Sequence, residues 1–219
     1  MTTVLAPPEK MAEQAAQTVI LHNVSWSLYQ TLLAEHRDVG APRFAYDRGT
    51  LEIHVPSFRH EHINRLLADI FRIVADELEI DFLDAGSTTF ERDDLIQGVE
   101  PDTAFYIQHA PEVREREQIN LSVDPAPDLI IEVAITSPSL NKFPILAGLG
   151  VPEIWRFHKN RVAILCLTDD GYAEQEQSGV LARITGAQLT QLIAESQQMK
   201  RTEWRARVRE RARALKQDR

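Results

Sequence analysis

The sequence predicts a mixed α/β domain with a central sheet flanked by helices. Residues 59–78 repeat apolar side chains at helical spacing, which is the strongest helical signal in the chain. Residues 128–135, DLIIEVAI, form the kind of apolar run that is typical of a strand buried on both faces. Between such segments the chain runs helix, hairpin, helix, several strands, helix, strands and helix, an order that fits one mixed sheet.

The first third of the chain supplies a strand, a helix and a hairpin. Residues 18–24, TVILHNV, predict a short strand, and residues 26–36 predict a helix for which Ser25 or Ser27 is the N-cap. In residues 43–55, RFAYDRGTLEIHV, two alternating segments flank the turn sequence DRGT. This pattern predicts a β-hairpin.

The remaining elements follow from the same rules. The stripe that predicts the helix over 59–78 consists of Ile63, Leu66, Leu67, Ile70, Ile73, Val74 and Leu78. Strands are expected within 80–92 and 102–108, and then a polar connection leads to the strand of 128–135. A short helix is expected around Phe143 to Leu149, with Pro144 in its first turn and Gly150 at its end. The segments EIWRFH and RVAILCL predict a second hairpin across Lys-Asn, and TDDGY predicts a further turn.

Composition places the chain among ordinary globular proteins. Hydrophobic residues make up 43% of the 219 residues and charged residues 26%. The apolar runs are too short to span a bilayer and the N-terminus lacks the pattern of a secretion signal, so we expect a cytoplasmic protein with no membrane partner. The single cysteine, Cys166, excludes a disulfide framework and is expected to be a small buried side chain.

Charge is distributed unevenly along the chain. The formal net charge is −9, yet residues 199–219 carry nine Lys/Arg and three Asp/Glu, a net of +6, which leaves −15 on the first 198. Trp204, Val208, Ala212 and Leu215 are spaced as in an amphipathic helix. This basic helix either contacts phosphates or docks on its own domain or on another subunit. We therefore divide the chain into a loose leader (1–18), a main domain (19–198) and a basic C-terminal helix (199–219).

A carboxylate stands in the middle of the apolar strand. Both neighbours of Glu132 are apolar, and a buried glutamate is costly unless something pairs with it or coordinates it. Asp102, in GVEPDTAFYI, opens a strand that we expect to lie near Glu132, although Pro-Asp is also ordinary turn chemistry. Two acids on adjacent strands can share a divalent cation such as Mg²⁺ or Mn²⁺, which prefers oxygen ligands.

Four segments together resemble the Uma-two family of putative restriction endonucleases. They are VILHNVSWSLYQTLLAE, AYDRGTLEIHVPSFRHEHINRLL, GSTTFERDDLIQGVEPDTAFYIQ and PDLIIEVAITSPSLNKFPILAGLGVPEIWRF, and the resemblance as a whole extends from about residue 18 to residue 168. The family is assigned to the PD-(D/E)XK nuclease superfamily. The resemblance implies a restriction-endonuclease-like mixed sheet with flanking helices and a metal-dependent site that hydrolyses phosphodiester bonds.

The resemblance also implies site residues. Asp102 matches the first acid of the motif and Glu132 the second, and with the backbone carbonyl of Val133 they would hold the metal. The motif lysine is absent, because the position two residues after Glu132 is Ala134. Lys142, in LNKFPI, matches a basic position common in the family and could reach the site from the next helix.

Histidines near the start of the long helix are further candidates. SFRHEH matches the serine-and-histidine lead-in of the family, which favours His60 over Glu61 as a residue at the edge of the site that orients a carboxylate or phosphate. A helix-start histidine satisfied by the backbone is the plainer interpretation. His60 and His62 could join the two acids in a transition-metal site, but nothing in the spacing requires imidazole.

The leading interpretation is a magnesium-dependent DNA endonuclease. Asp102, Glu132, Lys142 and His60 are its catalytic candidates, DNA is its expected partner, and a homodimer is possible. Ala134 keeps a second interpretation open, a catalytically silent nuclease-fold module that binds nucleic acid or a protein. A homo-oligomeric structural protein that assembles through its tail helix is a third.

Overall fold

The computed structural model describes residues 17–36, 40–135, 140–181 and 183–217, and it has the mixed α/β class that the sequence predicts. The helices are α1 (Trp26–His36), α2 (Phe58–Glu77), α3 (Ala110–Val113), α4 (Phe143–Leu149), α5 (Gly186–Ser196) and α6 (Arg201–Gln217). The strands are β1 (Gln17–Leu21), β2 (Arg43–Asp47), β3 (Thr50–Val55), β4 (Leu83–Gly86), β5 (Phe90–Arg92), β6 (Gln97–Val99), β7 (Thr103–Tyr106), β8 (Leu129–Ala134), β9 (Glu153–His158), β10 (Arg161–Thr168) and β11 (Gly171–Gln175).

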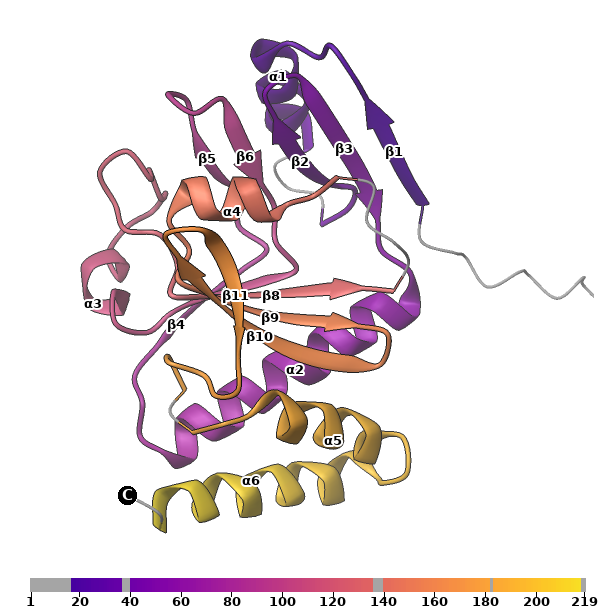
Figure 1. The fold of residues 1–219 in the computed structure, drawn as a ribbon, viewed down its shortest axis with the longest axis vertical. Helices are drawn as coiled ribbons and strands as arrows, with labels where there is room; N and C mark the ends of the chain where they lie inside the picture. The colour runs from indigo at the N-terminus through magenta and orange to yellow at the C-terminus, as the bar shows by residue number, and fades with distance from the viewer. Residues whose placement is uncertain (1–16, 37–39, 136–139, 182, 218–219) are drawn as a thin grey trace, which may run out of the picture.

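The strands form two sheets rather than one. The smaller has the order β1-β3-β2-β6-β5 and is antiparallel throughout, and the larger has the order β11-β10-β9-β8-β7-β4. In the larger sheet only β8 and β9 run parallel, and α4 is the crossover helix that connects them. Figure 1 shows α4 on one side of the larger sheet and α2 on the other.

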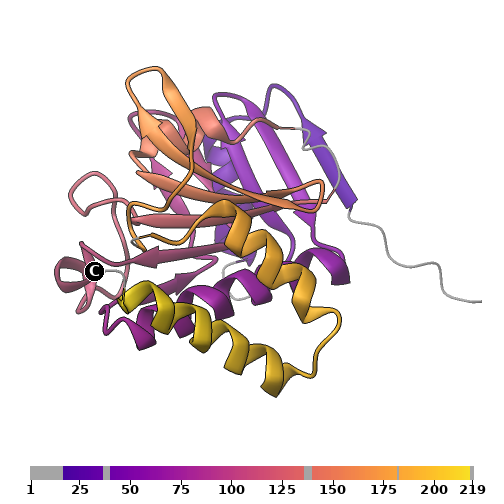
Figure 2. The same cartoon turned by 60° about the horizontal axis from the view of Figure 1, so that its bottom comes forward.

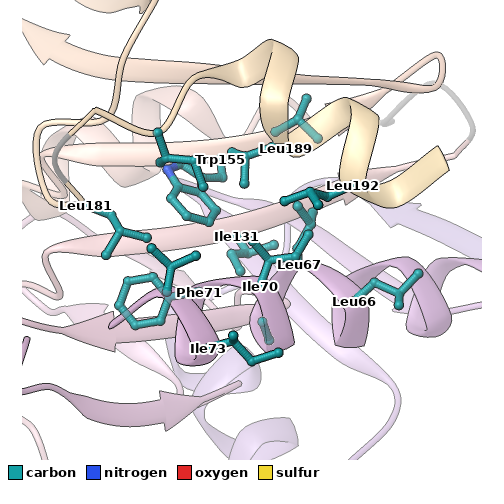
Figure 3. Packing of buried hydrophobic residues seen from close by; sticks show 14 of the residues in the cluster. Leu66, Leu67, Ile70, Phe71, Ile73, Ile131, Trp155, Leu181, Leu189 and Leu192 are labelled. Atoms are coloured by element: carbon teal, nitrogen blue, oxygen red, sulfur yellow. The ribbon is translucent and has the colours of Figure 1, made fainter. Parts of the chain in front are cut away.

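One face of the larger sheet carries the main core. The long helix α2 buries its apolar stripe against β8 and β9, and α5 and α6 pack beside it. In Figure 3, Phe71 and Ile70 of α2 lie near Trp155 of β9 and Ile131 of β8. The Phe71 and Phe105 rings stack with centroids 4.0 Å apart, a contact that adds to the burial of both rings.

The opposite face of the larger sheet packs against α4 and the smaller sheet. Ile130 of β8 and Ile154 of β9 contact a cluster that includes Leu146 of α4 and Ala45 of β2. On its other face the smaller sheet is covered by α1, where Tyr29 is fully buried. Side chains alternate along β8, so Ile131 and Val133 face α2 while Glu132 faces the junction between the two sheets.

The basic C-terminal helix docks on its own domain. Trp204, Val208 and Ala212 of α6 are buried in the main core, and the Trp204 indole N–H donates to the Leu192 carbonyl at 2.7 Å. Several of its cations pair with acids of the domain: Arg201 with Asp69, Arg207 with Glu195, Arg213 with Glu77, and Lys216 with Glu79. Figure 2 shows α6 lying along α2 and α5. None of the helices in the described ranges is long and apolar enough to cross a membrane.

Local sequence signals predicted most elements. Ser25 rather than Ser27 caps α1, since its hydroxyl accepts the Leu28 N–H at 3.2 Å. The predicted hairpins are present, and Gly150 ends α4 with a left-handed φ of 83°. Local patterns did not predict β6, β11, α3 and α5, which are short or weakly periodic segments. Most of the expected leader lies outside the described residues, and β1 already begins at Gln17.

We expect Trp204→Ala to lower the free energy of unfolding by about 3–5 kcal/mol, the usual cost of deleting a buried tryptophan. Trp204 is 1% exposed and also loses its indole hydrogen bond to Leu192. Urea denaturation measures the effect. Thr202→Ala, at an exposed position of the same helix, is the control and should change stability by less than about 0.5 kcal/mol. Equal stability of both variants would show that α6 is not docked.

Candidate active site

A pocket opens where the carboxyl end of β8, the start of α4, the end of β3 and the start of α2 meet. It contains about 700 Å³ of empty space, part of which is open to solvent. It is lined by Thr18, Glu52, His54, His60, Glu132, Val133, Ala134, Ile135, Leu140, Asn141, Lys142, Phe143 and Arg156. Charged and imidazole side chains from both sheets therefore converge at one place.

Asp102 and Glu132 come together through the pairing of β7 with β8. Thr103 is paired with Ile131 in this antiparallel ladder, so Asp102, one residue before Thr103, lies across from Glu132. Val133, the residue after Glu132, also donates its backbone N–H to the Asp102 carboxylate at 2.7 Å, so the two acids lie close together. The predicted proximity of the two acids is therefore present in the structure.

Asp102 is buried and held by donors from three elements. Arg43 of β2 donates to Oδ1, and the Val133 N–H of β8 donates to Oδ2 at 2.7 Å. His60 of α2 places its Nε2 3.2 Å from Oδ2. Burial acts to raise the pKa of Asp102, but His60, Arg43 and the nearby Lys142 outweigh it and hold the pKa well below its usual range. Asp102 is therefore a fixed carboxylate anion.

Glu132 is held less completely. Its side chain keeps 14% of its surface exposed toward the pocket, and Oε2 lies 3.4 Å from the Lys142 ammonium. Oε1 is buried and makes no hydrogen bond to any described residue. Burial raises the pKa of Glu132, and the negative charge of Asp102 adds to the shift. Glu132 therefore presents an unpaired carboxylate oxygen beside a second carboxylate.

Lys142 reaches the site from the start of α4, as the sequence predicted it could. Its ammonium lies 3.4 Å from Glu132 Oε2 and 3.8 Å from Glu52 Oε1, and its side chain is 16% exposed. Burial acts to lower the pKa of Lys142, but Glu132, Asp102 and Glu52 outweigh it, so the pKa is raised. Lys142 is therefore a permanent cation and not a proton acceptor at neutral pH.

The other predicted residues occupy distinct places. His60 is 3% exposed and contacts Asp102, whereas Glu61 points outward and receives Arg43 at 3.0 Å. Val133 contributes its N–H to Asp102, and the metal-ligand role of its carbonyl stays a prediction. Ala134 lines the pocket on the same side as Glu132.

Three further charged residues were missed by the sequence analysis. Arg43 links Asp102 to Glu61, Glu52 contacts Lys142, and Arg156 is paired in register with Glu132 and lies over the Phe143 ring at 5.0 Å. Each lies on a strand at an alternating position that would equally suit a solvent-facing side chain. Only the packing of the two sheets encloses them. The sequence contained only a weak indication of these charged residues, namely that a buried acid such as Glu132 requires cations nearby.

The chemistry of the site suits a hard divalent cation. Within the described ranges no three His, Cys, Asp or Glu side chains are grouped closely enough to form a ready metal centre. Magnesium, however, is commonly bound by one or two carboxylates together with waters and substrate phosphates. The unpaired Oε1 of Glu132, next to Asp102, fits that requirement.

Comparison with known families matches this chain over residues 26–196 to the model of Uma2, described as "Putative restriction endonuclease". The chain belongs to the Uma2 family. The matched range contains both sheets apart from β1, and it includes every candidate site residue. Membership of the Uma2 family supports nuclease chemistry and a nucleic-acid substrate.

Solved structures support the same fold. A putative nuclease belonging to DUF820 from Anabaena variabilis ATCC 29413 superposes on this Uma2 chain with a TM-score of 0.50 at 13% sequence identity. The alignment covers 78% of this chain and 99% of the other. A search of curated proteins found no match.

We expect Glu132→Gln to raise the melting temperature of the metal-free protein at pH 7 by roughly 2–4 °C, equivalent to about 1 kcal/mol. A raised pKa means that ionised Glu132 costs stability above its folded-state pKa, and a neutral amide removes that cost. The gain should vanish as the pH falls below 4.5, where the parent glutamate is protonated. Scanning calorimetry in chelator across this pH range measures both effects.

The matched control is Glu153→Gln at the start of β9. Glu153 is 2% exposed, and it accepts hydrogen bonds from Trp155, Ser178 and the Gly179 N–H at 2.6–2.7 Å. Its carboxylate is satisfied, so the amide should lower the melting temperature. A fall in both variants would show that Glu132 is not strained by its charge.

Proposed function

We propose that this Uma2 protein is a metal-dependent DNA endonuclease that hydrolyses phosphodiester bonds with Mg²⁺ or Mn²⁺ as cofactor. The observation that carries the proposal is the buried Glu132 Oε1, which has no hydrogen-bond partner among the described residues and lies beside a second carboxylate. An unpaired buried carboxylate oxygen at a pocket is costly in the free protein. A bound cation would relieve that cost, which is why this oxygen is the expected metal ligand.

Asp102 and Glu132 would hold the metal, with Val133 as the further ligand that the family resemblance implies. Asp102 can accept the metal without losing its present partners, because a carboxylate offers about four lone-pair sites and three are in use. A divalent cation held there would polarise the scissile phosphate and lower the pKa of a bound water.

Lys142 would stabilise negative charge as it develops on the phosphate. Its ammonium lies within the pocket and its pKa is raised, so it remains a cation at neutral pH. A fixed positive charge in a partly desolvated pocket favours the transition state over the ground state. Lys142 would also orient the attacking water by hydrogen bonding, without accepting its proton.

His60 and Arg43 would keep Asp102 in place. The two side chains approach Asp102 from α2 and from β2, and each contacts a different oxygen. The Asn64 amide also donates to the Asp102 carbonyl at 3.1 Å, which fixes the backbone at the same position. A carboxylate fixed from three elements needs little reorganisation when it binds a cation.

The pocket edge offers cations to a polyanion in spite of the net charge of −9. Arg156 lines the pocket, Arg59 at the start of α2 is held by Asn160 at 3.0 Å, and Lys159 is exposed at the β9–β10 turn. Phosphate binding depends on such local Lys and Arg contacts. The arginines of α6 that pair with acids of α2 are less available for this purpose.

A second candidate is a silent nuclease-fold module that binds nucleic acid or a protein. Ala134 favours it, because the side chain that follows Glu132 on the same face of β8 is a methyl group instead of the motif lysine. The two candidates share the fold and the pocket. Only cleavage activity and its dependence on Lys142 separate them.

We expect the purified protein to bind Mg²⁺ or Mn²⁺ and Glu132→Gln to lose at least about 10-fold in affinity, because one carboxylate ligand becomes a neutral amide. Isothermal titration calorimetry measures both proteins. Glu153→Gln, which alters a satisfied buried carboxylate outside the pocket, should bind as the parent does. Unchanged affinity in Glu132→Gln would place the metal elsewhere.

We expect Lys142→Ala to reduce plasmid cleavage by about 10²–10³-fold, the usual cost of one preorganised charge donor, with metal affinity within a few-fold. Arginine should not rescue it, because a planar guanidinium cannot replace a compact ammonium. Gel-based cleavage rates with Mg²⁺ or Mn²⁺ measure the effect. Lys200→Ala is the matched control for an exposed lysine outside the pocket and should stay within a few-fold of the parent.

The silent module gives a different result. The parent protein would then cleave no substrate faster than Asp102→Ala does. If Lys142→Ala cleaves as the parent does, the nuclease proposal stands but Lys142 has no catalytic role.

A further inference from the structure

Glu52 is a buried acid to which no role has been assigned above. It lies in the middle of β3, is 4% exposed, and is paired across the ladder with Ala45 of β2 and Ile20 of β1. Its neighbour Leu51 packs toward α1, so Glu52 points the other way, into the pocket. A buried carboxylate at such a position requires partners.

Both oxygens of Glu52 point to the segment that begins α4. Oε2 accepts the Leu140 N–H at 3.1 Å, and Oε1 lies 3.8 Å from the Lys142 ammonium. The same ammonium lies 3.4 Å from Glu132 Oε2. Lys142 therefore stands between a carboxylate of the smaller sheet and a carboxylate of the larger sheet.

We propose that Glu52 is the positioning residue for Lys142, holding the ammonium in the pocket from the side of the smaller sheet. The inference rests on the proposed function, in which Lys142 acts on the scissile phosphate. Glu52 acts through Lys142 and through the backbone of Leu140, and it does not touch the substrate.

The geometry gives a physical reason for this role. A lysine has a long flexible stem, so fixing its ammonium at one point costs rotamer entropy. Glu132 alone is a poor anchor, since its charge is shared with the metal in the proposed site. Glu52 contacts the Leu140 N–H and the Lys142 ammonium and is not a proposed metal ligand, so it can hold Lys142 without competing with the metal.

A purely structural role for Glu52 predicts something different. If Glu52 only secured the chain at Leu140, a neutral side chain that still accepts the Leu140 N–H would replace it. Glu52→Gln retains an acceptor oxygen and removes the charge that faces Lys142. The two roles are therefore separated by one isosteric substitution.

The first test is a double-mutant cycle on plasmid cleavage. We expect Glu52→Gln to lower kcat by about 10–100-fold, as for residues that orient a catalytic group, while KM changes by less than about 3-fold. In the Lys142→Ala background the same substitution should lower kcat by less than about 2-fold, because the ammonium that Glu52 positions is absent. Equal losses in both backgrounds, or parent-like cleavage by Glu52→Gln, would overturn the proposal.

The second test does not depend on cleavage. Acylation of Lys142 by acetic anhydride in the metal-free protein, followed by mass spectrometry, reports how freely the amine reacts. We expect Glu52→Gln to accelerate labelling of Lys142 several-fold, because the ammonium loses one of its two flanking carboxylates. Glu153→Gln, at a buried carboxylate that accepts backbone N–H groups, should leave the rate unchanged.

The two tests separate the inference from the proposed function. Unchanged labelling of Lys142 in Glu52→Gln overturns the positioning role, whatever the cleavage result. A parent protein that cleaves nothing, together with accelerated labelling, overturns the nuclease proposal and still supports Glu52 as the anchor of Lys142.

Discussion

The position of the Asp102 carboxylate depends on three separately formed parts of the molecule. Arg43 comes from the smaller sheet, the Val133 N–H from the larger sheet, and His60 from α2. None of these donors lies near Asp102 in the sequence, so the contact exists only when both sheets and the helix are in place. Because a buried unpaired charge is strongly unfavourable, this carboxylate couples the assembly of the pocket to the folding of the domain.

The parts of the fold that the sequence predicted are those fixed by local chemistry. The turn over Asp47 to Thr50 requires left-handed residues, and Arg48 and Gly49 adopt φ of 43° and 101°. Likewise Pro144 and Gly150 define the two ends of α4. The proximity of Asp102 to Glu132 was also predictable, because a buried acid needs a cation and two acids on adjacent strands can share one. Each inference used only a few adjacent residues or one adjacent strand.

What the sequence did not predict arises from contacts between distant elements. Arg43 and Glu52 lie on alternating strands that could as well have faced solvent, and only the packing of the smaller sheet against the larger encloses them. The strand β6 has three residues and contains Gly98, so it lacks any alternating signal. Its identity as a strand depends on pairing with β2 and β5. Contacts between distant elements, and not local propensity, therefore determine the burial of Arg43 and Glu52 and the formation of β6.

The proposed relocation of the motif lysine to Lys142 is consistent with the architecture of the pocket. A side chain at position 134 would enter along the same face of β8 as Glu132, and the methyl group of Ala134 leaves that space to a side chain from elsewhere. Lys142 enters from α4, the crossover helix that connects β8 to β9, and is therefore carried by the same unit as Glu132. The ammonium of a lysine on a strand is positioned by the rigid strand backbone. The ammonium of a lysine at the start of a helix must instead be positioned by the side chains that contact it. In the proposed site Glu52 would supply that restraint from the opposite sheet, which would connect the missing motif lysine with the unexpected buried acid.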